Sequence, residues 1–140
     1  MSPSPSIAVV ITNYNRRDDL RQALLSVRQQ DHAAAEILVV DNVSADGSRE
    51  MITSEFPEVE LIASEENLGM AGYSVGFRQA RSELLFQMDN DSLIPDSNVL
   101  GEVAQRFTEG PAELAVVACR VEEWLPDSDD IDEIRSRDRR

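Results

Sequence analysis

The chain has 140 residues and a mass of 15.6 kDa, which is the size of one domain built around a single core. Hydrophobic residues make up 41% of the sequence and charged residues 29%, which excludes disordered, collagen-like and disulfide-rich proteins. Thirteen basic against 27 acidic residues give a net charge of −14, so nucleic acid is an unfavourable partner. Every basic residue is arginine, and the absence of lysine excludes Schiff-base and lysine-dependent P-loop chemistry.

The single cysteine, Cys119, excludes an internal disulfide, and we expect it to be a small buried apolar residue. The longest apolar run, Leu114–Cys119, is far shorter than the ~18 residues that span a bilayer. The first six residues lack the basic and apolar regions of a secretory signal. We therefore expect a cytoplasmic protein without a transmembrane segment.

Five short runs of apolar and β-branched residues predict buried strands, at Ile7–Ile11, Glu36–Val40, Val59–Ala63, Leu84–Met88 and Leu114–Cys119. Helices are predicted between them, over residues 18–30, 49–54 and 75–80, and from Pro95 to a stop at Gly110. Alternating strands and helices indicate an α/β protein with a Rossmann-like parallel sheet and helices on both faces. We expect the strand order 3-2-1-4 plus a fifth strand.

The chain becomes polar after Trp124. Residues 125–140 hold six acidic and four basic residues. We therefore divide the chain into one domain, residues 1–124, and a polar tail, residues 125–140.

Polar side chains follow three of the predicted strands. In open parallel sheets, ligands bind outside the carboxyl ends of the strands, where the strand order reverses. We therefore expect three groups to converge there: Thr12, Asn13, Tyr14 and Asn15; Asp41, Asn42, Ser44 and Asp46; and Asp89, Asn90 and Asp91.

Asp89 and Asp91 stand two residues apart at a strand end, where side chains i and i+2 share a face. Neighbouring carboxylates repel each other, and a cation such as Mg²⁺ relieves the repulsion with one or two protein carboxylates, water and phosphate. The alternative is a solvated loop, because Asp-Asn-Asp is favourable turn sequence.

Two further segments have both a functional and a structural interpretation. Asp41 ends an apolar strand, where its carboxylate could accept hydrogen bonds from a base or ribose, or could instead form a turn or helix cap leading to Ser48. Residues 67–72, Asn-Leu-Gly-Met-Ala-Gly, let the backbone approach a phosphate or sugar. The alternative for residues 67–72 is loop flexibility and close helix packing.

Four motifs occur in order at the predicted strand ends. They are Val-Val-Ile-Thr-Asn-Tyr-Asn-Arg from Val9, Ile-Leu-Val-Val-Asp-Asn-Val-Ser-Ala-Asp-Gly-Ser from Ile37, Asn-Leu-Gly from Asn67, and Phe-Gln-Met-Asp-Asn-Asp-Ser from Phe86. Together they resemble the N-terminal, nucleotide-sugar-binding half of family-2 glycosyltransferases, which have the GT-A fold. The likeness covers residues 7–119 and is strongest to the rhamnosyltransferase-like branch.

The resemblance implies a metal-dependent enzyme that transfers a sugar from a nucleoside-diphosphate sugar to an acceptor hydroxyl with inversion. Asp91 would bind Mn²⁺ or Mg²⁺, while Asp89, the first acid of the D-x-D motif, would lie by the ribose close to that metal. Asp41 would accept a hydrogen bond from the pyrimidine ring. The remaining residues implied in the donor site are Thr12, Tyr14, Asn15, Asn42, Asn67 and Gly69.

The chain departs from the family in two places. Tyr73-Ser74-Val75 stands before Gly76, where the family usually has an asparagine. Family members are also longer, and their later half supplies the acceptor site and the base, so we expect a truncated GT-A fold and assign no catalytic base.

Two other functions are considered. A non-catalytic module that binds a nucleotide or nucleotide-sugar, or that serves in assembly, would also fit a truncated fold. A phospho-receiver is also an α/β protein with acidic residues at its strand ends. Receivers resemble one another in a lysine after the fifth strand, and because this chain has no lysine, that function is disfavoured. A sheet edge left open by truncation predicts a homo-oligomer or a covered edge.

Overall fold

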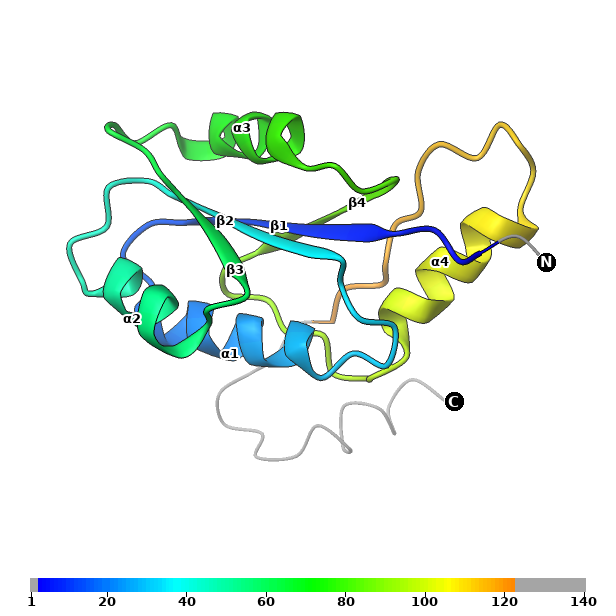
Figure 1. Cartoon of the computed structure of the whole chain (residues 1–140), viewed down its shortest axis with the longest axis horizontal. Helices are drawn as coiled ribbons and strands as arrows, with labels where there is room; N and C mark the ends of the chain where they lie inside the picture. The colour runs from blue at the N-terminus through cyan, green and yellow to red at the C-terminus, as the bar shows by residue number, and fades with distance from the viewer. Residues whose placement is uncertain (1–2, 123–140) are drawn as a thin grey trace.

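The structure is a computed structural model that describes residues 3–122 (Figure 1). Strands and helices alternate along the chain, as predicted. The elements are β1 (Ile7–Asn13), α1 (Arg17–Arg28), β2 (Glu36–Asp41), α2 (Ser48–Glu55), β3 (Val59–Ala63), the short 3₁₀ helix η1 (Gly69–Ala71), α3 (Gly72–Gln79), β4 (Leu84–Asp89) and α4 (Val99–Glu109).

The four strands form one parallel sheet in the order β3-β2-β1-β4. The α/β fold and the 3-2-1-4 order are therefore confirmed. In this register Asn13 lies beside Asp41, and Thr12 lies beside Asp89. The sequence clusters at three strand ends thus meet at one edge of the sheet.

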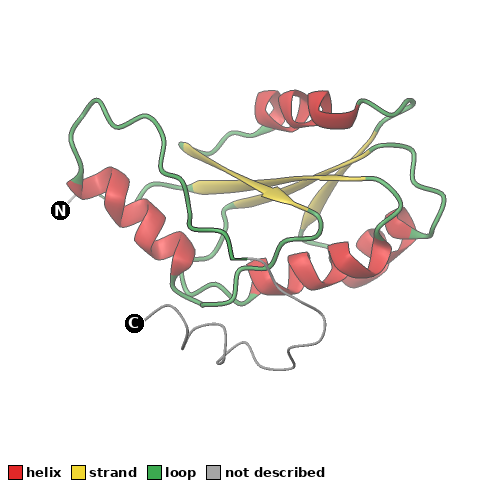
Figure 2. Cartoon of the chain, turned by 180° about the vertical axis from the view of Figure 1, so that it is seen from behind, coloured by secondary structure: helices red, strands yellow, loops and turns green. Residues whose placement is uncertain are grey.

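Helices cover both faces of the sheet (Figure 2). Ile7, Val9 and Ile11 of β1 belong to a large core with side chains of α1, α2 and α4. The alternate residues Ala8 and Val10 face the other way and pack against α3. This alternation follows from the two-residue period of a strand, and because both faces of β1 are covered, its sequence is a continuous apolar run.

Glycines bring α3 close to the sheet. A Cβ atom on Gly76 would lie 2.4 Å from Cγ1 of Val10, and one on Gly72 would lie 3.1 Å from Cγ2 of Thr12. A side chain at Gly76 would force Val10 or the helix to shift, and one at Gly72 would require Thr12 to give by a few tenths of an ångström. The glycines of this segment therefore serve close helix packing, one of the two structural alternatives considered for residues 67–72.

The prediction of a fifth strand at Leu114–Cys119 is wrong, because this segment forms an irregular loop (orange in Figure 1). Val116 is 78% exposed, and Cys119, expected to be buried, is exposed as well. An apolar run becomes a strand only when a neighbouring strand satisfies its backbone groups. Within residues 3–122, no strand pairs with this segment.

Among the residues that the structure describes, β4 is an edge strand. The backbone N–H of Leu84 donates to Ser6, on the β1 side, so the N–H and C=O groups of Leu85 and Gln87 point away from the sheet. Oligomerisation through this edge stays a prediction. The predicted tail, residues 125–140, lies outside the described residues, and among those described no helix has the length and apolar character needed to cross a membrane.

Candidate functional site

Asn13 links the carboxyl ends of three strands. Its side-chain nitrogen donates to Oδ1 of Asp41 at 3.0 Å, and its side-chain oxygen accepts from the Asn90 amide at 3.0 Å. Asn13 is 1% exposed, and its contact with Asp41 is buried while its contact with Asn90 is partly buried. The convergence expected from the sequence is therefore present, with Asn13 as its centre.

The Asp41 carboxylate is fully buried and accepts four hydrogen bonds. Oδ1 accepts from Asn13 and from the Ser44 hydroxyl, at 2.6 Å, while Oδ2 accepts from the Ser44 backbone, at 3.0 Å, and from Nε of Arg49, at 2.6 Å. Such a set satisfies the lone pairs of a carboxylate. In this conformation Asp41 organises the loop that follows β2, which is the turn alternative considered for it.

Opposing effects act on the pKa of Asp41. Burial favours the neutral acid, but the hydrogen bonds from Ser44, Arg49 and Asn13 favour the carboxylate and hold its pKa below the ordinary value. Arg49, in the first turn of α2, also donates to the backbone carbonyl of Ser64, which joins this network to the end of β3. Sequence reasoning missed Arg49, although a basic residue eight positions after a buried aspartate was a possible signal.

Backbone contacts hold the loops after β1 and β2 together. The N–H of Asn15 donates to the Ser44 hydroxyl at 2.9 Å, and the N–H of Ala45 donates to the Asn15 side chain at 2.7 Å. Asp46 accepts from the N–H of Arg17 at 2.8 Å. Asn15 itself has a φ of 49°, a left-handed conformation that asparagine tolerates. Asn15 thus has a structural role in this loop, and its predicted contact with the donor stays a prediction.

The segment 67–72 is tied to the end of β2 through Asn42. The Asn42 side chain donates to the Gly69 carbonyl and accepts from the N–H of Leu68, both at 3.3 Å. Asn67 accepts from the N–H of Gly69 at 2.9 Å. Gly69 has a φ of 54°, which explains the glycine at this turn. Asn42, Asn67 and Gly69 are thereby brought together, and their role in binding a donor stays a prediction.

On the β4 side, Thr12 and Asp89 are register neighbours, and Tyr73 lies against Asp89. The Tyr73 hydroxyl is 2.7 Å from Oδ1 of Asp89 and 2.9 Å from the Met88 carbonyl oxygen. Burial, together with the Asp89 carboxylate, raises the pKa of Tyr73 to about 12. Sequence reasoning noted Tyr73 only as a departure from the family and did not predict this contact.

Three residues predicted in the donor and metal site are exposed, whereas Asp41, predicted to meet the pyrimidine ring, is buried. Tyr14 is 51% exposed, and Asp89 and Asp91 are exposed at the end of β4 and in the turn after it. No three histidine, cysteine or acidic residues within 3–122 are grouped as a complete protein metal site. Two exposed carboxylates fit Mg²⁺ or Mn²⁺ only when phosphate and water complete the shell, which is usual for Mg²⁺.

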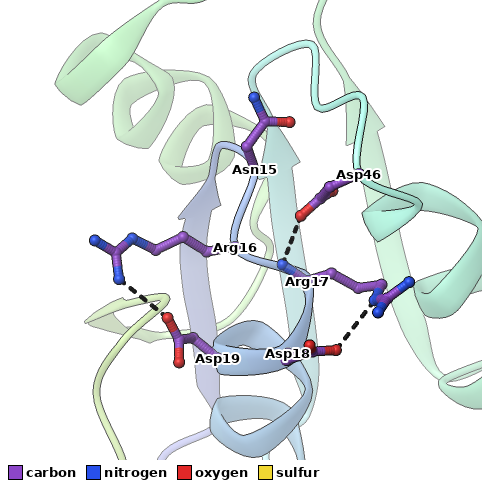
Figure 3. Close-up of a pocket in the computed structure, with 6 residues that line it drawn as sticks. All are labelled: Asn15, Arg16, Arg17, Asp18, Asp19 and Asp46. Carbon is purple, nitrogen blue, oxygen red and sulfur yellow. Dashed lines mark hydrogen bonds and ion pairs between the residues drawn. The ribbon is translucent and has the colours of Figure 1, made fainter.

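A depression of about 530 Å³ lies beside this edge, at the start of α1 (Figure 3). It shares only Asn15 with the predicted donor site. Its two arginines are engaged by neighbouring acids, Arg16 with Asp19 at 3.0 Å and Arg17 with Asp18 at 3.1 Å. With those charges compensated, the depression has no evident anion site, and the polar edge of the sheet remains the better candidate.

A parallel 3-2-1-4 sheet with polar residues gathered at its carboxyl edge defines an α/β protein of the class that binds ligands at that edge. The chain belongs to a family within this class, Glycosyl transferase family 2, whose family model matches residues 8–136.

Individual relatives agree with this assignment. The succinoglycan biosynthesis protein ExoO of Rhizobium meliloti is 30% identical over 115 residues, which are 80% of this chain and 32% of ExoO. Across eight curated relatives, the chain spans between 23% and 42% of their length.

Solved structures of GT-A enzymes share the fold. The mannosyltransferase PcManGT of Pyrobaculum calidifontis, solved with GDP-Man and Mn²⁺, superposes with a TM-score of 0.70 at 23% identity, over 77% of this chain and 34% of PcManGT. TarS of S. aureus, solved with UDP-GlcNAc, has a TM-score of 0.65 at 25% identity, over 74% of this chain and 31% of TarS. The narrower resemblance to rhamnosyltransferase-like enzymes stays a prediction.

Proposed function

We propose that this chain is the donor-binding part of an inverting glycosyltransferase that holds a nucleoside-diphosphate sugar with Mn²⁺ or Mg²⁺ at the carboxyl edge of β1, β2 and β4. The observation that carries the proposal is the Asn13 bridge, which gathers the family motifs of three strands at one edge. The nucleotide sugars present with PcManGT and TarS support the same ligand class.

The polar residues divide into two groups by exposure. Tyr14 and Asp89, with the half-buried Thr12, are available to the base and ribose. The Asp41 carboxylate accepts hydrogen bonds from Asn13, Ser44 and Arg49. In this proposal Asp41 therefore acts on the base indirectly, by holding the loop of residues 41–46 in shape. The other proposed donor-site residues, which shape the loops, are Asn15, Asn42, Asn67 and Gly69.

Asp89 and Asp91 would hold the metal, which would offset the negative charge that develops on the departing nucleoside diphosphate. They suit this task because ion pairs within residues 3–122 engage neither of them, whereas Asp41 is paired with Arg49. In the transfer itself, an acceptor oxygen forms a bond to the sugar carbon while the carbon–diphosphate bond breaks. The acceptor proton passes to a base that we assign to no described residue.

A second candidate is a module that binds the nucleotide sugar without turnover. This candidate needs the donor-binding edge alone and no acceptor base, and we assign that base to no residue within 3–122. The two candidates differ in one measurement, slow hydrolysis of a nucleotide sugar that is lost in Asp91→Ala. Hydrolysis that depends on Asp91 favours the enzyme, and binding without hydrolysis favours the module.

The proposal is tested by thermal shift with UDP, dTDP and GDP in the presence of Mn²⁺, repeated with a chelator. A ligand at 100 times its dissociation constant adds ~2.7 kcal/mol to the free energy of unfolding. We expect one nucleotide to raise the midpoint with Mn²⁺, and both the chelator and Asp91→Ala to abolish the rise. Glu109→Gln is the control, because it removes one negative charge at the end of α4, from a residue that is not part of the proposed donor site. No rise with any nucleotide contradicts the proposal.

A further inference from the structure

Tyr73 is a buried residue that reaches the polar edge of the sheet. It is 4% exposed, and its ring packs in a small core with Ala8, Val10 and Leu38. Its hydroxyl is 2.7 Å from Oδ1 of Asp89, a residue that is otherwise exposed. Tyr73 therefore connects the interior of the protein to a carboxylate at the proposed donor site.

The position of α3 makes this contact possible. Gly72 precedes Tyr73 and Gly76 follows it by three residues, and both sit where a Cβ atom would press against β1. Because α3 lies this close to the sheet, a tyrosine near its start reaches the end of β4. The same residue is part of the segment in which the sequence departs from the family's usual asparagine.

The contact between Tyr73 and Asp89 gives the carboxylate a hydrogen bond from an uncharged donor. Arginine neutralises the acids Asp18, Asp19 and Asp41 elsewhere in the described chain, but Asp89 is bonded to a neutral phenol. A neutral donor fixes the carboxylate while leaving its negative charge available to a cation. Oδ2 of Asp89 accepts no hydrogen bond from residues 3–122 and stays open to a ligand.

We propose that Tyr73 is a positioning residue that orients the Asp89 carboxylate for the metal and the nucleoside diphosphate. This inference rests on the proposed function. Without the hydroxyl, an aspartate on an exposed strand end samples several rotamers, and binding must then order it at an entropic cost. Fixing one oxygen in advance removes that cost, as partners of metal ligands generally do.

The test is calorimetric titration of Mn²⁺ with the preferred nucleoside diphosphate into wild type and Tyr73→Phe, which keeps the ring and removes the hydroxyl. We expect about 10-fold weaker binding in Tyr73→Phe, in the usual range for loss of such a partner. In an Asp89→Ala background, which removes the acceptor, the same change should cost less than about twofold, since the two residues act through one contact. Ser74→Ala removes an exposed hydroxyl from the next residue of α3 and should bind as wild type does.

The outcomes separate the two claims. Wild type that binds no nucleoside diphosphate overturns the proposed function, and the inference falls with it. Wild type that binds, with Tyr73→Phe equal to it, overturns the inference alone. An equal loss in both backgrounds shows a general structural effect and also overturns it. If Tyr73→Phe unfolds at the assay temperature, Tyr73→4-fluorophenylalanine replaces it, because the fluorine fills the space of the hydroxyl without donating.

Discussion

Asn13 donates its side-chain amide to Oδ1 of Asp41 at 3.0 Å, and this contact fixes the end of β1 to the end of β2. The other side of the amide accepts from Asn90, after β4. One asparagine thus uses its donor and its acceptor on different strands. A hydrophobic or charged residue of similar size cannot do both.

Replacing Asn13 should weaken both the fold and the site. Asn13→Ala leaves the buried Asp41 one donor short and removes the acceptor for Asn90, so we expect a loss of about 2 kcal/mol in the free energy of unfolding. Urea unfolding measures this loss, and thermal shift measures the accompanying fall in nucleotide affinity. Gln22→Ala, at an exposed position of α1, should change stability by less than about 0.5 kcal/mol. Equal stabilities for the two variants would contradict the bridging role.

The Asp41 carboxylate should make the free energy of unfolding depend on pH. Its pKa is lower in the folded state than the ordinary value near 3.9, so the unfolded chain binds this proton more readily. The stabilisation is therefore complete above about pH 5 and is lost as the pH falls through the folded pKa. Unfolding free energies of wild type and Asp41→Asn, measured from about pH 2.5 to about pH 7, should differ most at neutral pH and converge in acid.

The exposed Asp19, paired with Arg16 in the same helix, provides the control for this titration. Asp19→Asn should keep the wild-type pH dependence, because exposed ion pairs contribute little to stability. A constant difference between wild type and Asp41→Asn across the whole range would contradict the interpretation. It would mean that the Asp41 network stabilises the fold independently of its charge.

The hydrophobic pattern located each of the four strands of the sheet. Val59–Ala63 was predicted with its observed bounds, and the other three strands extend only one or two residues beyond their predicted ends. Apolar runs carry this information best for β1 and β2, because strands buried on both faces need apolar residues at nearly every position. Leu114–Cys119 has the same composition and forms a loop, because a strand also requires a partner, which composition does not specify.

The site was predicted less completely than the sheet. Side-chain type and strand-end position identified Asp41 and Asp89, but neither Arg49 nor Tyr73 was assigned a role. Both reach the edge from helices, over separations of 8 and 16 residues to their acidic partners. Such contacts depend on how closely each helix packs on the sheet, and only the three-dimensional arrangement fixes that distance.

The close approach of α3 to the sheet should make Gly76 intolerant of a side chain. Gly76→Ala places a methyl group 2.4 Å from Cγ1 of Val10, so the helix must shift, and we expect a loss of about 2 kcal/mol. Gly101→Ala is the matched control within α4, where the nearest atom, Cβ of His32, is 3.6 Å away. There alanine should stabilise the helix by about 0.5 kcal/mol or more. Denaturant unfolding should give opposite signs for the two changes, and equal signs would contradict the packing argument.

Val43 lies in the loop between Asp41 and Ser44 with a φ of 60°, a conformation that is strained for a β-branched residue. The hydrogen bonds from Ser44 to Asp41 hold the loop in this shape. Val43→Gly should relieve the strain and raise the free energy of unfolding by about 1 kcal/mol, because little apolar burial is lost at a side chain that is 42% exposed. Thermal unfolding measures the gain. Val116→Gly is the control, at an exposed position without a positive φ, and it should give no gain in stability. A loss of stability in Val43→Gly would contradict the strain assigned to Val43.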